Sequence, residues 1–121
     1  MEVMMKGKLQ KIAVIQSQEL LLTDAQSALD LAATISSETG SQAFVCSKES
    51  LSPDFFVLAT GLAGEILQKY TTYGFKLAVW GEYLEKSQAL HDFMYESNQG
   101  QNFFFVATEE QAIAKIEQFL N

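Results

Sequence analysis

The sequence predicts one α/β domain with a mostly parallel or mixed sheet of four to five strands and about four helices. Strand-like and helix-like stretches alternate along the whole chain, with no internal repeat or linker. Several apolar runs lack alternation, as expected of strands that are buried on both faces. The chain has 121 residues, which suffices for one core but not for two. We therefore expect a single domain over residues 1–121.

The first strand is predicted at residues 9–16, because Ile12 to Ile15 form an apolar run. A short extended piece at residues 20–22 forms either an antiparallel pair with it or one bent strand. Three lysines lie near the start of the chain: Lys6, Lys8 and Lys11. We interpret this start as a solvated segment rather than a nucleic-acid-binding arm, because a net charge of −7 would repel a phosphate backbone.

The first helix is predicted to begin at Thr23. Gln26 occupies the capping-box position, and Asp24 places a negative charge beside the positive end of the helix. Apolar residues at helical spacing continue this helix to about Ser37, and Gly40 is its predicted stop.

Three apolar runs predict central parallel strands at residues 43–46, 75–80 and 103–106. A helix is expected between the second and third of these strands, at residues 86–98, where apolar residues gather on one side. The last helix is predicted to start at Thr108, because Gln111 completes a capping box before an apolar stripe.

The stretch from residue 47 to residue 73 leaves the carboxyl end of a central strand, which is the usual place for sites in α/β sheets. Its helix has two possible starts. Ser52 could cap a helix that has Pro53 at its first position, or residues 52–59 could stay extended and Thr60 could cap it. We favour Thr60. The buried stripe would then consist of Leu62, Ile66, Leu67, Tyr70 and Tyr73.

With Thr60 as the cap, the first turn of this helix lacks a carboxylate and contains Gly61 and Gly64. The positive end of the helix is then uncompensated, as a bound anion or a phosphorylated hydroxyl would require. The alternative is that the glycines let the helix lie close to the sheet or to another subunit.

Few other side chains indicate chemistry. His91 is the only histidine and is expected on a helix edge, and Cys46 is the only cysteine and is expected in the core. These residues do not form a catalytic triad or a metal-ligand spacing. We therefore expect no enzymatic activity, no metal, no cofactor and no internal disulfide.

Three further positions have two interpretations each. Asp54, Phe55 and Phe56 form either a partner-binding patch, in which aromatic anchors lie beside a charge, or a packing element of the core. Asn98 either contacts a ligand or satisfies backbone groups at the end of a helix. Glu65 is expected to pair with the lysine four residues later, and a proton-transfer role would need more evidence.

The chain start contains no apolar stretch of the length that a secretory signal needs, and no segment approaches the roughly 20 apolar residues of a membrane span. A lone cysteine suits a reducing compartment. We therefore expect a cytoplasmic protein that binds neither membranes nor nucleic acid.

The residues around Thr60 resemble the STAS domain of bacterial anti-sigma-factor antagonists and anion-transporter tails. The shared arrangement is a strand, a short loop, a hydroxyl residue, a Gly-Leu-small-Gly helix and a strand that ends in Gly. In the antagonists, a partner kinase phosphorylates the Ser or Thr directly before the Gly-Leu, and Thr60 is the matching residue. This sequence departs at two positions, because Leu58 replaces the usual Asp and Ala59 replaces a small hydroxyl residue.

Over nearly its whole length, the chain resembles a small bacterial family, the domain of unknown function DUF4180. It is carried by LSPDFF at residues 51–56, TGLAGEILQK at residues 60–69, DFMYESN at residues 92–98 and the final Glu-rich helix. This resemblance implies no particular activity.

Three functional hypotheses follow. The leading one is a non-enzymatic regulatory or protein-interaction module of STAS-like type, whose surface combines residues 47–65 with the loops at Gly81 and Asn98. The alternative is a protein that binds a small ligand, nucleotide or anion at the helix end formed by Thr60 and Gly61. The third is a homodimer that packs through Gly61 and Gly64. The candidate binding residues are Asp54, Phe55, Phe56, Thr60, Gly61, Gly64, Glu65 and Asn98.

Overall fold

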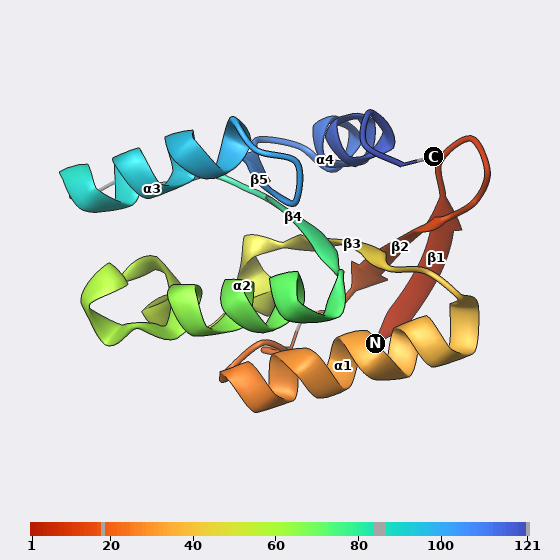
Figure 1. Cartoon of the computed structure of the whole chain (residues 1–121), viewed down its shortest axis with the longest axis horizontal. Helices are drawn as coiled ribbons and strands as arrows, with labels where there is room; N and C mark the ends of the chain where they lie inside the picture. The colour runs from red at the N-terminus through yellow and green to blue at the C-terminus, as the bar shows by residue number, and fades with distance from the viewer. Residues whose placement is uncertain (18, 84–86, 121) are drawn as a thin grey trace.

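The computed structural model describes residues 1–17, 19–83 and 87–120. Its five strands form one sheet in the order β1-β2-β3-β4-β5 (Figure 1). β1 is antiparallel to β2, and the other three neighbouring pairs are parallel, so the sheet is mixed. The strands are β1 (Glu2–Lys6), β2 (Ile12–Gln16), β3 (Ala43–Ser47), β4 (Lys76–Trp80) and β5 (Phe103–Val106).

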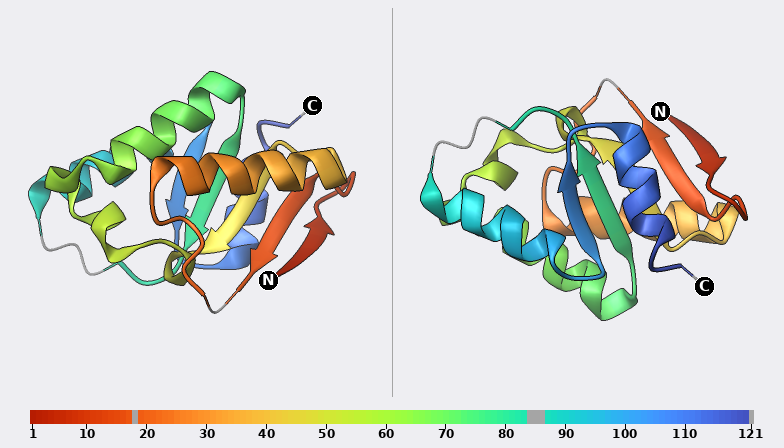
Figure 2. Two further views of the ribbon diagram at one scale, coloured as in Figure 1. Left: turned by 90° about the horizontal axis from the view of Figure 1, so that it is seen from below. Right: turned by 90° about the horizontal axis from the view of Figure 1, so that it is seen from above.

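Four helices surround the sheet, which confirms the predicted α/β class. They are α1 (Ala25–Thr39), α2 (Leu62–Tyr73), α3 (Gln88–Asn98) and α4 (Glu109–Glu117). α1 and α2 cover one face, α4 covers the other, and α3 runs beside β5 (Figures 1 and 2). None of the four, as far as the structure describes them, is long and apolar enough to cross a membrane.

The central strands are buried on both faces, as their unbroken apolar runs predict. Successive residues alternate between two apolar clusters because side chains of a strand point to opposite faces. Phe44 belongs to the larger cluster, which also contains the apolar faces of α1, α2 and α3. Val45 belongs to the smaller one, under α4.

The start of the chain differs from the prediction. The antiparallel partner of β2 is β1, not residues 20–22, and the first predicted strand begins at Ile12 rather than Leu9. β1 was not predicted: its apolar run, Val3 to Met5, is only three residues long between charged residues, and every position of the strand is exposed or half-buried. Lys6 is also not simply solvated, because its Nζ lies 2.9 Å from Oε2 of Glu109.

Asp24, not Thr23, caps α1. Its Oδ1 accepts a hydrogen bond of 2.7 Å from the amide of Ser27, and the Ser27 hydroxyl accepts one from the Asp24 amide. The carboxylate is the better acceptor and also lies at the positive end of the helix. The predicted stop is confirmed, since Gly40 adopts φ 79° directly after the last helical residue.

The other helix ends depend on local side chains. Thr108 and Gln111 form the predicted capping box of α4. Ser87 caps α3, and the earlier start predicted at residue 86 lies outside the described residues. Tyr73 was predicted in the buried stripe of α2, but it is 56 % exposed and is the last residue of the helix, before the cap Gly74.

Candidate functional site

The loop that leaves β3 folds into three short 3₁₀ helices, Lys48–Ser50, Pro53–Phe56 and Leu58–Thr60. Ser52 caps the second of them, because its hydroxyl accepts a hydrogen bond from the amide of Asp54 at 3.2 Å. The predicted extended conformation of residues 52–59 is therefore wrong. Pro53 has its φ angle preset for a helical turn, so this 3₁₀ helix forms where the favoured interpretation placed an extended chain.

Thr60 lies before the first turn of α2, and Gly61, with φ 79°, is the residue that precedes the helix. The Thr60 hydroxyl donates to the carbonyl oxygens of Asp54, at 2.7 Å, and Val57, at 2.9 Å. The same oxygen accepts from the Leu62 amide at 3.3 Å. The predicted cap is therefore displaced by one residue, and the Thr60 hydroxyl holds the preceding turn together.

The electrostatic basis of the anion-site hypothesis is weaker than the sequence indicated. α2 begins at Leu62, so its first turn includes Glu65, and the predicted first turn without a carboxylate is wrong. The Thr60 and Gly61 amides already donate to the carbonyls of Val57 and Leu58. The N-terminal end of α2 is therefore less suited to binding an anion than the sequence indicated.

Gly64 does not serve close packing within the chain. It is exposed, and a Cβ atom added there would meet no other atom within 4 Å. The same open space surrounds Gly61, whose left-handed backbone gives a sufficient reason for glycine at that position. Contact of these glycines with another subunit stays a prediction.

The three residues of the predicted aromatic patch have different environments. Phe55 is 0 % exposed, and its ring centroid lies 6.0 Å from that of Phe105 in the core. Phe56 is half-buried, with its ring 5.9 Å from that of Tyr83. Asp54 is exposed. The packing interpretation therefore describes Phe55, and only Phe56 and Asp54 reach the surface.

Asn98 uses both ends of its side-chain amide within the protein. Its Nδ2 donates to the Phe105 carbonyl at 3.0 Å, and its Oδ1 accepts from the Phe105 amide at 2.7 Å. These bonds satisfy an outward-facing peptide group of the edge strand β5. Asn98 therefore satisfies backbone groups, as one interpretation predicted, but these groups belong to β5 rather than to the end of its helix.

The three 3₁₀ helices between residues 48 and 60 are called the 3₁₀ segment. An apolar groove of about 790 Å³ lies between this segment, Tyr83 and the start of α3. Two of its residues, Leu20 and Val57, have exposed fractions of 52 % and 53 %. We call it the apolar groove. Its lining consists of Leu20, Lys48, Glu49, Leu51, Pro53, Phe56, Val57, Leu58, Ala59, Tyr83, Ser87, Ala89 and Leu90. Of the eight candidate residues, only Phe56 lines it.

Most polar atoms of the groove lining already have partners in the chain. The Tyr83 hydroxyl donates to the Val79 carbonyl, and the Ser87 hydroxyl accepts from the Leu90 amide. The Lys48 ammonium donates to the carbonyl oxygen of Glu82. The groove therefore presents chiefly carbon to a ligand.

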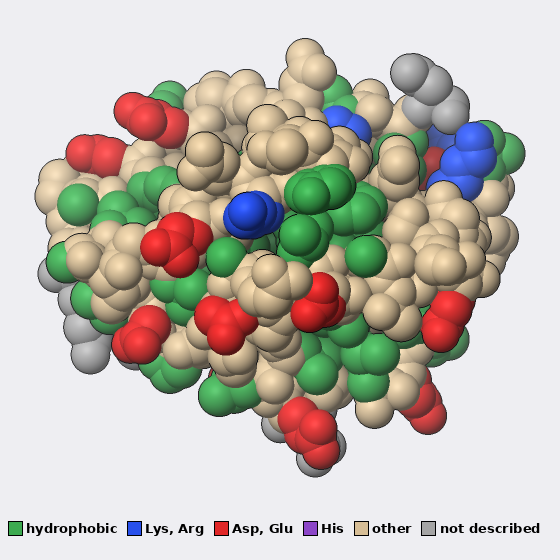
Figure 3. Space-filling view, turned by 60° about the horizontal axis from the view of Figure 1, so that its bottom comes forward, with side chains coloured by type: hydrophobic (Ala, Val, Ile, Leu, Met, Phe, Trp, Pro, Cys, Tyr) green, Lys and Arg blue, Asp and Glu red, His purple; other side chains and the backbone are tan. Residues whose placement is uncertain are grey.

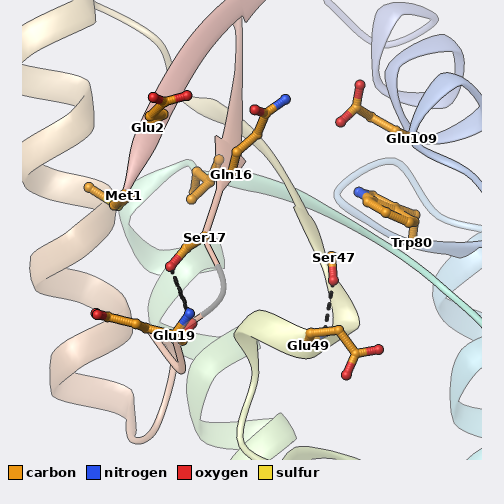
Figure 4. A pocket seen from close by; sticks show the side chains of 10 residues that line it. Met1, Glu2, Gln16, Ser17, Glu19, Ser47, Glu49, Trp80 and Glu109 are labelled. Atoms are coloured by element: carbon orange, nitrogen blue, oxygen red, sulfur yellow. Dashed lines mark hydrogen bonds between the residues drawn. The ribbon is translucent and has the colours of Figure 1, made fainter.

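A second cavity, of about 690 Å³, opens at the carboxyl ends of β2, β3 and β4 (Figure 4). Four of its residues are glutamates, so we call it the acidic cavity. Trp80 and Glu109 enter it from one side and Glu2 and Gln16 from another. Its lining consists of Met1, Glu2, Ile15, Gln16, Ser17, Glu19, Ser47, Glu49, Trp80 and Glu109.

The acidic cavity was not predicted from the sequence, because its residues come from segments far apart in the chain. The available signal was positional: Ser47 and Trp80 are the last residues of central strands, where α/β sheets place their sites. The side chains of the described part of the chain do not form a metal-binding group of three or more ligands, here or elsewhere.

Cys46 and His91 lie where the sequence predicted. Cys46 is fully buried, and burial raises the pKa of its thiol to about 12, so it is not a thiolate nucleophile at neutral pH. His91 lies on an exposed position of α3.

A family model with the description "Domain of unknown function (DUF4180)" matches residues 8–116 of the chain. The chain belongs to this family. No significant match was found among curated proteins or among solved structures. The likeness to STAS domains therefore stays a prediction. All residues that line the apolar groove fall within the range matched by DUF4180, whereas Met1 and Glu2 of the acidic cavity precede it.

Proposed function

We propose that this DUF4180 domain is a non-enzymatic protein-interaction module that binds an apolar segment of a partner protein in the apolar groove. The observation that carries the proposal is the groove itself, whose rim exposes half of Val57 and half of Leu20 to solvent. Contiguous exposed apolar surface with a polar rim is typical of interaction sites. Binding would also regulate the partner, because its apolar segment would be covered by the groove and could not make other contacts.

The groove fits a protein segment better than a small ligand. Sites for small ligands place a few free polar groups that fix the orientation of the ligand. Here the polar atoms of Tyr83, Ser87 and Lys48 are already engaged by the chain. A protein segment can be oriented instead by its shape and by charges at the rim.

The charges around the groove favour a partner segment with basic flanks. Glu49 lines the groove, and the exposed Asp54 and Glu82 are next to lining residues in the chain. Lys48 is the one cation among the described lining residues, and its ammonium contacts a carbonyl oxygen. The whole chain carries a net charge of −7, and Figure 3 shows carboxylates spread over the face that α1 and α2 form. Complementary charge would speed association with such a partner.

Peptide selection tests this proposal even though the partner is unidentified. Random peptides displayed on phage are selected on the immobilised wild-type domain, and the enriched peptides are synthesised for fluorescence anisotropy. We expect spaced apolar residues flanked by lysine or arginine. Val57→Asn should raise the dissociation constant about tenfold or more through lost apolar contact, and Glu49→Lys should raise it in a salt-dependent manner.

Leu9→Asn is the matched control, because Leu9 is 66 % exposed, lies outside the groove and undergoes the same change from aliphatic to amide. Its affinity should equal that of the wild type. The proposal is wrong if no peptide is enriched, if the enriched peptides have acidic flanks, or if Val57→Asn binds as tightly as Leu9→Asn.

A further inference from the structure

The two edges of the sheet are treated differently. At the β5 edge, Asn98 binds the outward-facing peptide group of Phe105 and α3 runs alongside the strand. At the other edge, β1 has β2 on one side, and no strand or helix lies beyond it in the described part of the chain (Figure 2). An unprotected edge of this kind can pair with another strand.

We propose that two copies of the chain form a homodimer by antiparallel pairing of their β1 strands about Met4, which would join the two sheets into one. This interface does not involve the apolar groove, and it differs from the predicted packing of Gly61 and Gly64. It is supported by the order of charged and apolar residues in β1, which is complementary to itself.

The charges of β1 match in an antiparallel pair. Its sequence is Glu-Val-Met-Met-Lys, with opposite charges at the two ends. Pairing two copies about Met4 places Glu2 of each copy opposite Lys6 of the other, on the same face of the sheet. Opposite charges in directly paired positions stabilise neighbouring strands, and like charges destabilise them. The two-fold symmetry therefore creates two attractive pairs at once.

The apolar residues of β1 match as well. Met4 lies at the centre of the strand and is 47 % exposed, and in the dimer it would contact Met4 of the second copy. Val3 would face Met5 of the second copy on the opposite side of the sheet, where both residues already pack against the main core. On one face of the joined sheet, the charged pairs would flank the two Met4 side chains. On the other face, the apolar Val3 and Met5 side chains would extend the core across the interface.

The β1 edge is held in position before any pairing. Lys6 is bound to Glu109 of α4, and the Lys8 amide donates to Oε1 of Glu117 on the same helix at 3.2 Å. Its partner strand β2 is in full register with it from Glu2 to Lys6. A preorganised strand loses little conformational freedom on association.

The dimer would also change the acidic cavity. Glu2 lines that cavity, so Lys6 of the second copy would lie beside its rim and add a positive charge there. The cavity of the dimer would then combine residues of both copies.

Sedimentation velocity over a range of concentrations tests the dimer. We expect the wild type to move from the 13.5 kDa monomer to twice that mass as the concentration rises. Met4→Lys places two like charges on the symmetry axis and should raise the dissociation constant about tenfold or more. Leu9→Lys, which adds the same charge to the neighbouring turn, should leave the dissociation constant unchanged.

A charge exchange identifies the interface. Glu2→Lys and Lys6→Glu each place like charges opposite each other in their own homodimers, so each variant alone should be monomeric. A mixture of the two restores both attractive pairs and should form a heterodimer. Gly64→Leu, on a distant helix, should dimerise like the wild type.

The β1 dimer is refuted if the wild type stays monomeric at its highest soluble concentration. It is also refuted if Met4→Lys dimerises normally, if the mixture of charge variants does not associate, or if Gly64→Leu alone dissociates the dimer. A heterologous peptide that pairs with β1 while the wild type stays monomeric would point to a different occupant and would overturn the proposal.

Discussion

Thr60 shows how one hydroxyl can organise a turn. Its oxygen contacts the carbonyls of Asp54 and Val57 and the amide of Leu62, so it links the second 3₁₀ helix to the start of α2. The glycines that follow Thr60 in the sequence already indicated that this position is special. The reason is different, because the hydroxyl serves the backbone of its own chain.

Thr60→Val should lower the free energy of unfolding by about 1 kcal/mol, the usual net worth of a hydrogen bond, and Thr60→Ser should be close to wild type. Urea denaturation measures both. Thr72→Val is the control, since that hydroxyl makes one bond, to the Gln68 carbonyl within α2. Equal stability of Thr60→Val and wild type would contradict this role.

The bonds of the Thr60 hydroxyl also determine what a phosphate mimic at this position would do. Thr60→Glu also removes the bonds to Asp54 and Val57. If that variant lost partner binding, the cause could be either the lost hydrogen bonds of the turn or the added negative charge. Comparison with Thr60→Val separates the two effects.

Among the secondary-structure elements, the edge strand β5 is completed by a side chain of the preceding helix. Asn98 supplies one donor and one acceptor to Phe105, as a neighbouring strand would. The motif at residues 92–98 stands out in the sequence, but the partner of Asn98 lies on the strand beyond it. The packing of α3 against β5 brings the two together.

Asn98→Ala should destabilise the fold by about 1–3 kcal/mol, because a part-buried amide and carbonyl lose their partner. Asn98→Asp keeps an acceptor for the Phe105 amide, so its loss of stability should be smaller. Hydrogen exchange at the Phe105 amide should accelerate in Asn98→Ala and much less in Asn98→Asp, which keeps the acceptor of that amide. The exposed neighbour Gln99→Ala should resemble the wild type. Unchanged exchange at Phe105 in Asn98→Ala would refute this role of the side chain.

Helix caps and strands differ in how far the sequence predicts them. The capping box of Thr108 and Gln111 was predicted because both partners lie within one turn. β1 was missed because its apolar run is only three residues long between charged residues, and its pairing depends on β2 across a turn. The favoured start at Thr60 did not include the 3₁₀ helices, whereas the alternative cap at Ser52 with Pro53 in the first position is where the second of them begins. The short turns follow from the preset φ of Pro53 and from local bonds that compete closely with an extended chain.

For the molecule as a whole, three weakly acidic groups belong to the larger core or pack against it. Burial raises the pKa of the Cys46 thiol to about 12. Burial, reinforced by Cys46, also raises the pKa values of Tyr70 and Tyr83. All three groups hold their protons more tightly in the folded state than in the unfolded state. Unfolding therefore releases protons at alkaline pH.

The domain should lose stability as the pH rises above about 9, where the unfolded thiol begins to ionise. Each group contributes a slope of about 1.4 kcal/mol per pH unit between its unfolded and folded pKa values. The urea midpoint measured between about pH 8 and pH 11 gives this slope. Cys46→Ala should reduce the slope even if it lowers stability at every pH. A slope equal to that of the wild type would show that the thiol does not contribute.

The fold class, the central strands and the last helix were predictable from the sequence, because they depend on composition and on patterns within about one element. The DUF4180 family was recognised by resemblance, from motifs spread over nearly the whole chain. The pairing of β1, the role of Asn98, the bonds of Thr60 and the two cavities became visible in the folded chain alone. The two cavities join residues from distant segments. The contacts of Thr60, Asn98 and β1 join neighbouring elements, whose relative positions are set only when the core packs.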